Sequence, residues 1–302
     1  MRGCPTLEAW SRRGTVGARV SPHRAMNRFL RRGGGLVGFL LLVYLGVCGY
    51  MFLNQASFLY FPERSYDASP AALGMSFEEV RLKAADGVSI AGWWVPAERA
   101  LGAMVIAHGN GGNMSHRLDK VRLFHEMGFA VLIFDYRGYG ASEGKPTEVG
   151  TYADMAAAVD HVLTVRRVPA SRLALYGESL GGAVAVEEAT RRTPAALVLD
   201  STFTSVPAMA SHYYPWLPAR LLLRFRYDSL SKVPRLKCPV LILHSPEDDI
   251  VPYAMGRQLF GASPEPKRFA DLVGGHNTVG LMFAPAAQKE MAAFLASVYA
   301  DP

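Results

Sequence analysis

The sequence predicts an α/β fold, in which a mostly parallel central sheet is flanked by helices on both sides. Two observations support this prediction. Short runs of residues are continuously apolar, which is typical of parallel strands buried on both faces, and segments with helical periodicity alternate with them. The apolar runs are residues 101–107, 129–134, 173–176, 196–199 and 239–243, and the helical segments are residues 117–127, 152–165, 179–191, 253–260 and 281–299.

The chain has 302 residues, and its net charge of +6 is concentrated at the N-terminus. Eight arginines and one acid give residues 1–34 a charge of +7, so the rest carries −1 and the basic character does not indicate a nucleic-acid partner. Because apolar periodicity is almost absent there, we predict a disordered tail over residues 1–34. Met26 is an alternative start of translation.

Residues 35–53 contain no charged side chain. A helix needs about 20 apolar residues to cross a bilayer, so we expect a transmembrane anchor; a cleaved signal peptide is the alternative. A lipoprotein cleavage before Cys48 is disfavoured by the bulky Val47. The arginines before the span predict a cytoplasmic N-terminus and a following domain on the outer, periplasmic or lumenal, side.

Residues 54–76 are predicted to be a juxtamembrane linker, whose aromatic residues either meet the membrane interface or pack on the domain. The domain itself is expected over residues 77–302. It opens with a hairpin around Asp86-Gly87, and a last short strand is expected over residues 268–273. Residues 203–237 interrupt the alternation and predict a cap-like insertion, with an ordinary crossover helix as the alternative.

Ser179 is the candidate nucleophile. It lies in Gly177-Glu178-Ser179-Leu180-Gly181, between an apolar strand and a helix, which is the context of a nucleophile elbow. The glycines leave room for a sharp turn, and the N-terminus of the helix favours a developing oxyanion. The backbone N–H of Leu180 is therefore predicted to form half of an oxyanion hole. The loop His108-Gly109-Asn110-Gly111 follows another strand, and we expect the N–H of Asn110, or else of Gly111, to form the other half.

An acid and then a base must follow the serine in chain order. His276, after Gly274-Gly275 in a late loop, is the candidate general base. For the acid, Asp248 is our choice, and its role would be to accept the imidazole N–H. Its rivals are Asp249, Glu247 and Asp200.

From about residue 77 onward the chain resembles the α/β-hydrolase superfamily. Within it, the chain is similar to single-pass membrane-anchored members with a short cap, in the serine aminopeptidase- and depalmitoylase-like branch. The matching motifs are His108-Gly109-Asn110-Gly111-Gly112-Asn113, Phe134-Asp135-Tyr136-Arg137-Gly138-Tyr139-Gly140, Gly177-x-Ser179-x-Gly181, Asp248-x-x-Val251-Pro252 and Gly275-His276. The resemblance implies that Asp248 is the triad acid, because Val251-Pro252 follows at the expected offset, and that Asp135 and Arg137 stabilise a loop. Ser245 departs from the glycine common in relatives.

These features predict a membrane-anchored serine hydrolase that cleaves an acyl- or lipid-type ester or thioester through an acyl-enzyme, carboxylesterase- or thioesterase-like (EC 3.1). No cofactor is expected. No metal is expected either, since His-Glu-x-x-His and Cys-x-x-Cys spacings are absent and the three cysteines suggest no disulfide framework. The alternatives are a peptidase-like hydrolase and an inactive membrane-tethered binding protein.

Overall fold

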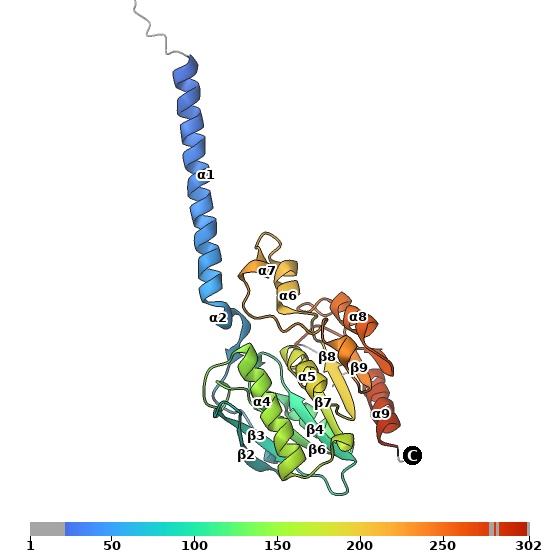
Figure 1. The fold of residues 1–302 in the computed structure, drawn as a ribbon. Helices are drawn as coiled ribbons and strands as arrows, with labels where there is room; N and C mark the ends of the chain where they lie inside the picture. Colours follow the sequence, from blue (N-terminus) through green and yellow to red (C-terminus); the bar gives the residue numbers. More distant parts are fainter. Residues whose placement is uncertain (1–21, 278–280, 282–283, 301–302) are drawn as a thin grey trace, which may run out of the picture. The chain divides into compact units, whose positions relative to one another are not determined.

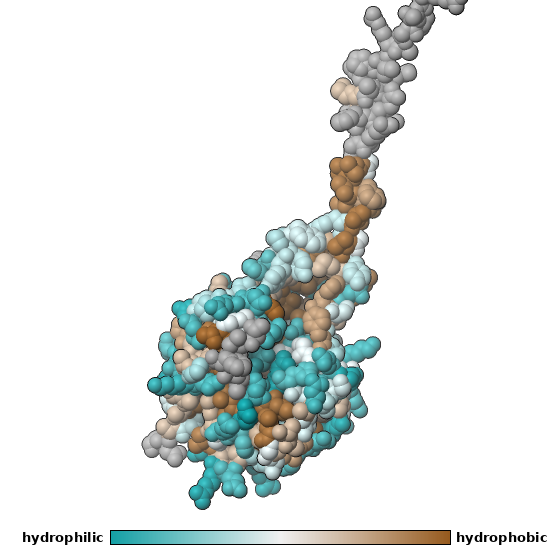
Figure 2. Space-filling model, turned by 180° about the vertical axis from the view of Figure 1, so that it is seen from behind, coloured by the Kyte–Doolittle hydropathy of each residue, from teal (hydrophilic) through white to brown (hydrophobic). Residues whose placement is uncertain are grey.

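The computed structural model describes residues 22–277, 281 and 284–300, and the chain divides into two units, residues 1–50 and 51–302 (Figure 1). Helix α1, Pro22–Leu53, contains one candidate membrane span, Gly35–Leu53. Leu36, Phe39 and Leu42 are all more than half exposed, and Figure 2 shows hydrophobic residues along this part of the helix. Its length and composition suit a membrane anchor or a signal sequence.

Helix α1 begins at Pro22, so residues 22–34 are helical in the structure, whereas the sequence predicted a disordered tail there. Proline favours the first position of a helix because its fixed φ suits the helix and its missing N–H needs no partner. Arginine is also a good helix former. The rest of the predicted tail, residues 1–21, lies outside the described residues.

An eight-stranded sheet forms the centre of the domain and confirms the predicted fold class. The strand order is β10-β9-β8-β7-β4-β6-β3-β2, in which β3 pairs antiparallel with β2 and β6 and all other pairs are parallel. The strands are β2 (Glu78–Lys83), β3 (Ser89–Val95), β4 (Gly102–Ala107), β6 (Phe129–Phe134), β7 (Leu173–Glu178), β8 (Ala196–Asp200), β9 (Val240–His244) and β10 (Lys267–Asp271). The predicted hairpin is β2–β3.

Helices cover both faces of the sheet (Figure 1). One face carries α4 (Glu148–Asp160), α5 (Leu180–Arg191) and α8 (Tyr253–Ala262), and the other carries α3 (Leu118–Glu126) and α9 (Pro285–Tyr299). The helix predicted to run to residue 165 changes after Asp160 to a π-helical turn, His161–Val165.

The core divides into two clusters because side chains alternate along each strand. In β4, Val105 belongs to the cluster that includes Ala183 of α5, whereas its neighbour Ile106 belongs to the cluster that includes Phe124 of α3 and Met291 of α9. Every residue of β4 is buried. This two-sided burial explains why the central strands are continuously apolar in the sequence.

The predicted linker, residues 54–76, packs on the domain. It contains α2 (Gln55–Leu59), β1 (Phe61–Pro62) and a 3₁₀ turn (Pro70–Leu73), and β1 pairs in parallel with β5 (Gly111–Gly112). Tyr60 is buried, and its hydroxyl lies 2.7 Å from that of Tyr227. Phe58 and Phe61, by contrast, are exposed.

The insertion between β8 and β9 contains two short helices, α6 (Val206–Tyr213) and α7 (Ala219–Leu222), and a 3₁₀ turn (Val233–Arg235). Ser205 caps α6 by accepting a hydrogen bond from the backbone N–H of Ala208. We call residues 203–237 the cap. It follows the carboxyl end of β8 and therefore begins at the edge of the sheet where α/β folds bind ligands.

Candidate active site

Ser179 lies at a sharp turn between β7 and α5. Its φ of 52° and ψ of −115° are strained for a residue with a side chain. Glycines on either side make the turn sterically possible: a Cβ at Gly181 would lie 2.0 Å from the carbonyl oxygen of Ala107, and one at Gly177 would lie 2.4 Å from that of Gly181. The backbone N–H of Ser179 donates to the carbonyl of Asp200 at 2.8 Å, which fixes the turn against β8.

The structure brings the three predicted catalytic side chains into one chain of contacts. Nε2 of His276 lies 3.2 Å from Oγ of Ser179, and Nδ1 of His276 lies 2.8 Å from Oδ2 of Asp248. The other carboxylate oxygen of Asp248 accepts the backbone N–H groups of Ile250 and Val251. The acid is therefore held by its own loop and turned toward the imidazole.

Electrostatics in this group favour a charged acid beside a basic imidazole. Burial lowers the pKa of His276, but the hydrogen bond and negative charge of Asp248 outweigh it, so this pKa is raised from its ordinary value. Burial raises the pKa of Asp248, and the hydrogen bond with His276 outweighs that effect and lowers it. An ionised Asp248 would thus stabilise the imidazolium that forms during proton transfer.

The rival acids hold the surrounding loops. Oδ1 of Asp249 accepts the backbone N–H of His276 at 2.9 Å, and Oε2 of Glu247 accepts that of Gly274 at 3.0 Å. Both therefore fix the loop that carries the histidine. Asp200 accepts hydrogen bonds from the hydroxyls of Tyr176 and Ser201. Among the described residues, none of these three carboxylates forms a hydrogen bond with the imidazole ring of His276.

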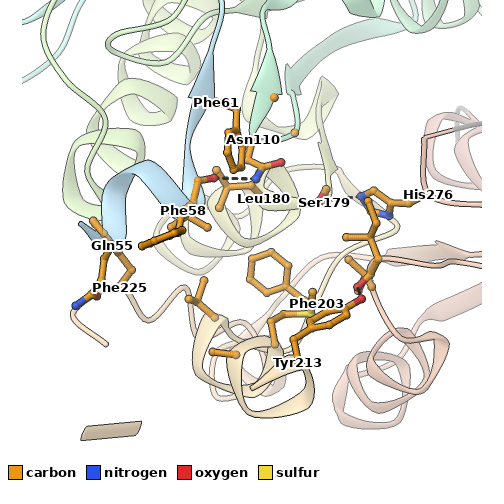
Figure 3. A pocket seen from close by; sticks show the side chains of 18 of the residues that line it. Gln55, Phe58, Phe61, Asn110, Ser179, Leu180, Phe203, Tyr213, Phe225 and His276 are labelled. Carbon is orange, nitrogen blue, oxygen red and sulfur yellow. Dashed lines mark hydrogen bonds between the residues drawn. The ribbon is translucent and has the colours of Figure 1, made fainter. Parts of the chain in front are cut away.

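Asn110 and Leu180 both line the pocket beside Ser179 (Figure 3). Leu180 is the first residue of α5, where backbone N–H groups have no intrahelical acceptor. The peptide of Asn110 is held from several directions: its carbonyl accepts the N–H of Phe61 at 2.9 Å and the hydroxyl of Tyr139 at 2.7 Å. Its side-chain amide donates to the carbonyl of Leu59 at 2.8 Å. The predicted oxyanion loop is thus fixed by the segment that follows the candidate span.

A charged cluster next to the nucleophile was not anticipated from the sequence. Glu178 pairs with Lys120 and lies 3.5 Å from Nη2 of Arg117. Burial raises the pKa of Glu178, but the two cations lower it to about 2. Arg117 also donates to the carbonyl of Gly111 at 3.3 Å, so the cluster links the elbow to the oxyanion loop. Glu178 occupies the unspecified position before the serine in Gly-x-Ser-x-Gly, so the motif gives no indication of such a cluster.

Other residues of the recognised motifs have structural partners. His244 lies 2.9 Å from the carbonyl of Val251, and His108 lies 2.7 Å from that of Gly109. Oδ1 of Asp135 accepts the backbone N–H of Met114, and Arg137 pairs with Asp86 and Asp154. Among the described residues, no group of three or more histidine, cysteine, aspartate or glutamate side chains is arranged to hold a metal ion.

A largely apolar pocket of about 730 Å³ opens at Ser179 and His276 (Figure 3). Its volume is in the range typical of small-molecule sites. The walls come from the end of α1 with α2 and β1, from the cap, from the loop of Asn110, and from the loops that carry Ser179, Asp248 and His276. The apolar and aromatic lining includes Met51, Phe52, Phe58, Leu59, Phe61, Leu180, Phe203, Val206, Met209, Tyr213, Tyr214, Leu217, Leu222, Leu223, Phe225 and Val251.

The cap and the loop that carries Asp248 are joined by a hydrogen bond between two residues that line this pocket. The hydroxyl of Tyr213 in α6 donates to the carbonyl of Ile250 at 2.6 Å and approaches that of Asp249 at 3.2 Å. Figure 3 shows Tyr213 and Phe203 on the side of the cap and Phe58 near Phe225. The sequence predicted a cap but gave no reason to expect that residues 51–61 would also form a wall of the pocket.

Comparison with known proteins gives consistent matches. Residues 98–232 match the family described as Serine aminopeptidase, S33. An uncharacterised protein of Mycobacterium tuberculosis is 38% identical over 250 residues, covering 82% of this chain and 89% of the relative. The α/β-hydrolase domain-containing protein WAV2 of Arabidopsis thaliana is 32% identical over 239 residues, covering 71% and 77%. An esterase of Pyrococcus furiosus has a similar fold, with a TM-score of 0.66 at 20% identity over 78% of this chain and 98% of that one.

Proposed function

The chain belongs to the α/β-hydrolase superfamily and is a hydrolase, and from this premise we propose that it is a membrane-anchored serine hydrolase of acyl esters or thioesters. The observation that carries the proposal is the linear arrangement of Ser179, His276 and Asp248, with contacts of 3.2 and 2.8 Å. The proposed anchor is Gly35–Leu53. By the excess of arginine before this span, the domain lies on the outer side of the membrane.

In the proposed first step, Nε2 of His276 takes the proton of Ser179 as Oγ bonds to the carbonyl carbon of the substrate. The negative charge that forms on the carbonyl oxygen is stabilised by the N–H groups of Leu180 and Asn110. His276 then gives its proton to the leaving alcohol or thiol as the carbon–oxygen or carbon–sulfur bond breaks. An acyl group remains on Ser179.

In the second step, a water molecule gives a proton to His276 and bonds to the acyl carbon. Collapse of this intermediate breaks the bond to Oγ, and the imidazolium returns its proton to Ser179. The acid product leaves, and the side chains return to their starting state. No step needs a cofactor.

The apolar pocket supports an acyl group as the part of the substrate that is bound. Among the residues that line it, the carboxylates are Glu63 and Glu178. Glu178 is paired with Lys120 and Arg117, so it is a poor partner for the ammonium group of an aminopeptidase substrate. The family match nevertheless bears the name of an aminopeptidase. Parallel turnover of p-nitrophenyl esters and aminoacyl-nitroanilides separates the two activities.

Labelling with a fluorophosphonate probe tests the proposal. Membranes that contain the full chain should be labelled, and membranes that contain Ser179→Ala at equal abundance should not. The label should sediment with the membrane fraction. A folded protein that is not labelled would instead favour the inactive, membrane-tethered binding protein. Label in the soluble fraction would point to a cleaved signal peptide.

A further inference from the structure

The end of the candidate span is continuous with a wall of the pocket. The span ends at Leu53, yet Met51 and Phe52 already line the pocket, as do Gln55, Phe58 and Leu59 beyond it. A helix rises only about 1.5 Å per residue. Whatever the orientation of the domain, this wall therefore stays within about 10 Å of the point where the chain would leave the hydrocarbon.

Gln55 ties the cap to that same point. Its side chain is buried, with 5% of the residue exposed. Its Nε2 donates to the carbonyls of Phe52 and Leu222 at 3.0 and 2.9 Å, and its Oε1 accepts the backbone N–H of Arg224 at 2.7 Å. Both the nitrogen and the oxygen of the amide are therefore hydrogen-bonded, and the side chain connects the last turn of α1 with α7 of the cap.

Arg224 adds a second connection between the cap and the span. Its guanidinium donates to the carbonyl of Phe52 at 3.1 Å and lies 4.9 Å from the centre of the Phe52 ring. Both contacts hold the cap against Phe52, the second-last residue of the proposed span. The cap therefore cannot move far from the membrane surface unless these bonds break.

The cap exposes large apolar side chains next to this connection. Trp216 is 53% exposed and Leu221 is 85% exposed, and neither lines the pocket. Arg224 and Arg226 are exposed close by in the chain. Tryptophan is enriched where proteins meet the headgroup region, and arginine can keep its charge among headgroups while its stem lies on apolar surface. This combination fits a lipid surface.

We propose that the cap tip, defined as Trp216 and Leu221, docks on the surface of the bilayer that holds the anchor. The substrate would be an ester-linked acyl lipid dissolved in that bilayer. Its acyl chain would pass from the membrane into the pocket along the wall formed by residues 51–59, without crossing water. This inference deepens the proposed function and rests on it.

The choice of a bilayer over a protein partner follows from proximity. One residue, Asn54, separates the end of the span from Gln55, and Gln55 bonds directly to α7. A surface held this close to lipid is desolvated by lipid at little entropic cost, because the tether has already fixed its position. A second copy of the chain on the cap tip is the competing occupant.

The test compares two substrates with the full chain reconstituted in phosphatidylcholine vesicles. One is water-soluble p-nitrophenyl acetate, and the other is a long-chain fluorogenic acyl ester dissolved in the bilayer. The variant carries Trp216→Ser and Leu221→Ser. Its turnover of the soluble ester should equal that of the wild type, whereas its turnover of the bilayer ester should fall about tenfold, which corresponds to about 1.4 kcal/mol.

A matched control is Val165→Ser, which changes another exposed apolar residue (61% exposed) in the π-helical turn after α4, whereas the cap contacts Glu148 at the other end of that helix. This variant should leave both rates unchanged. An unchanged ratio of the two rates in the Trp216/Leu221 variant would overturn the docking proposal. The variant Ser179→Ala tests the chemistry separately, because it should lose both rates. Failure of the proposed function is therefore distinguishable from failure of docking.

Fluorescence gives an independent readout. The chain has four tryptophans, and the difference between wild type and Trp216→Phe isolates the signal of Trp216 from those of the other three. Lipids brominated on the acyl chain should quench that signal. If brominated lipids leave it unquenched, the cap tip lies in water or against a second copy of the chain, and the docking proposal fails.

Discussion

Nδ1 of His276 lies 2.8 Å from Oδ2 of Asp248, and this contact raises the pKa of the imidazole from its ordinary 6.5 in spite of burial. The proposed base must be neutral to accept a proton. As pH falls through the raised pKa, His276 becomes charged and activity is lost. We therefore expect the acid limb of the kcat/KM profile to have its midpoint above pH 6.5.

Replacing the acid tests the cause of that shift. Asp248→Asn should move the acid limb to lower pH and reduce kcat by roughly 10⁴-fold, the effect of the same change in a serine protease triad. Asp249→Asn is the matched control. The carboxylate of Asp249 accepts a hydrogen bond from the backbone N–H of His276, and among the described residues it forms none with the imidazole ring. Equal shifts in the two variants would contradict the assignment of Asp248.

The strained turn at Ser179 predicts that a substitution can abolish activity and still stabilise the fold. Ser179→Ala and Ser179→Gly should both abolish turnover, since each removes Oγ. Glycine tolerates the observed φ of 52°, whereas alanine does not. We expect Ser179→Gly to exceed Ser179→Ala in free energy of unfolding by about 1 kcal/mol. Chemical denaturation measures the difference, and equal stability would argue against strain at the elbow.

The side chain of Asn110 should act as a positioning group. Its amide donates to the carbonyl of Leu59 at 2.8 Å, while the backbone N–H of the same residue is a proposed oxyanion donor. In Asn110→Ala the donor remains but is less well held. We expect kcat to fall roughly tenfold, less than the 10²–10³-fold seen when an oxyanion donor is removed, with KM unchanged. A rise in KM at constant kcat would instead indicate a role in substrate binding.

Glu178 should contribute to stability in a defined pH range. Its pKa is lowered to about 2 from 4.5, so its contribution is complete above about pH 4.5 and is lost as pH falls toward 2. Glu178→Gln leaves Lys120 and Arg117 without their anion and should reduce the free energy of unfolding by about 3 kcal/mol. Glu126→Gln breaks only an exposed pair with Arg122 and should cost less than about 1 kcal/mol. Similar losses in the two variants would contradict the buried pairing.

The predictable parts of the fold are those with a local signal. Burial on both faces makes β4 and β6 continuously apolar, and the Asp86-Gly87 turn marks the β2–β3 hairpin. The order of Ser179, Asp248 and His276 along the chain was enough to predict that they meet, because strands in this fold end at one edge of the sheet. The resemblance to a family supported the choice of Asp248 over Asp249.

The unpredicted parts depend on contacts between residues far apart in sequence. A strand of two residues, β1, has no periodicity to detect, and its pairing with β5 spans about fifty residues of chain. Gln55 looks like an ordinary polar residue until its partners Leu222 and Arg224 are known. Similarly, nothing near Glu178 in the sequence indicates Lys120 or Arg117. Side-chain partners of this kind are set by tertiary packing alone.

The pairing of β1 with β5 limits how the proposed anchor could be exchanged. Phe61 and Pro62 lie opposite Gly111 and Gly112, so the domain needs residues well before Phe77, where the sequence suggested that it begins. A fusion that joined a foreign membrane anchor at residue 77 would remove the strand that borders the oxyanion loop. A junction at Asn54 would keep it. By the same argument, only the part of the chain before α2 could be exchanged without disturbing the loop of Asn110, so the proposed anchor and the domain cannot be separated at residue 77.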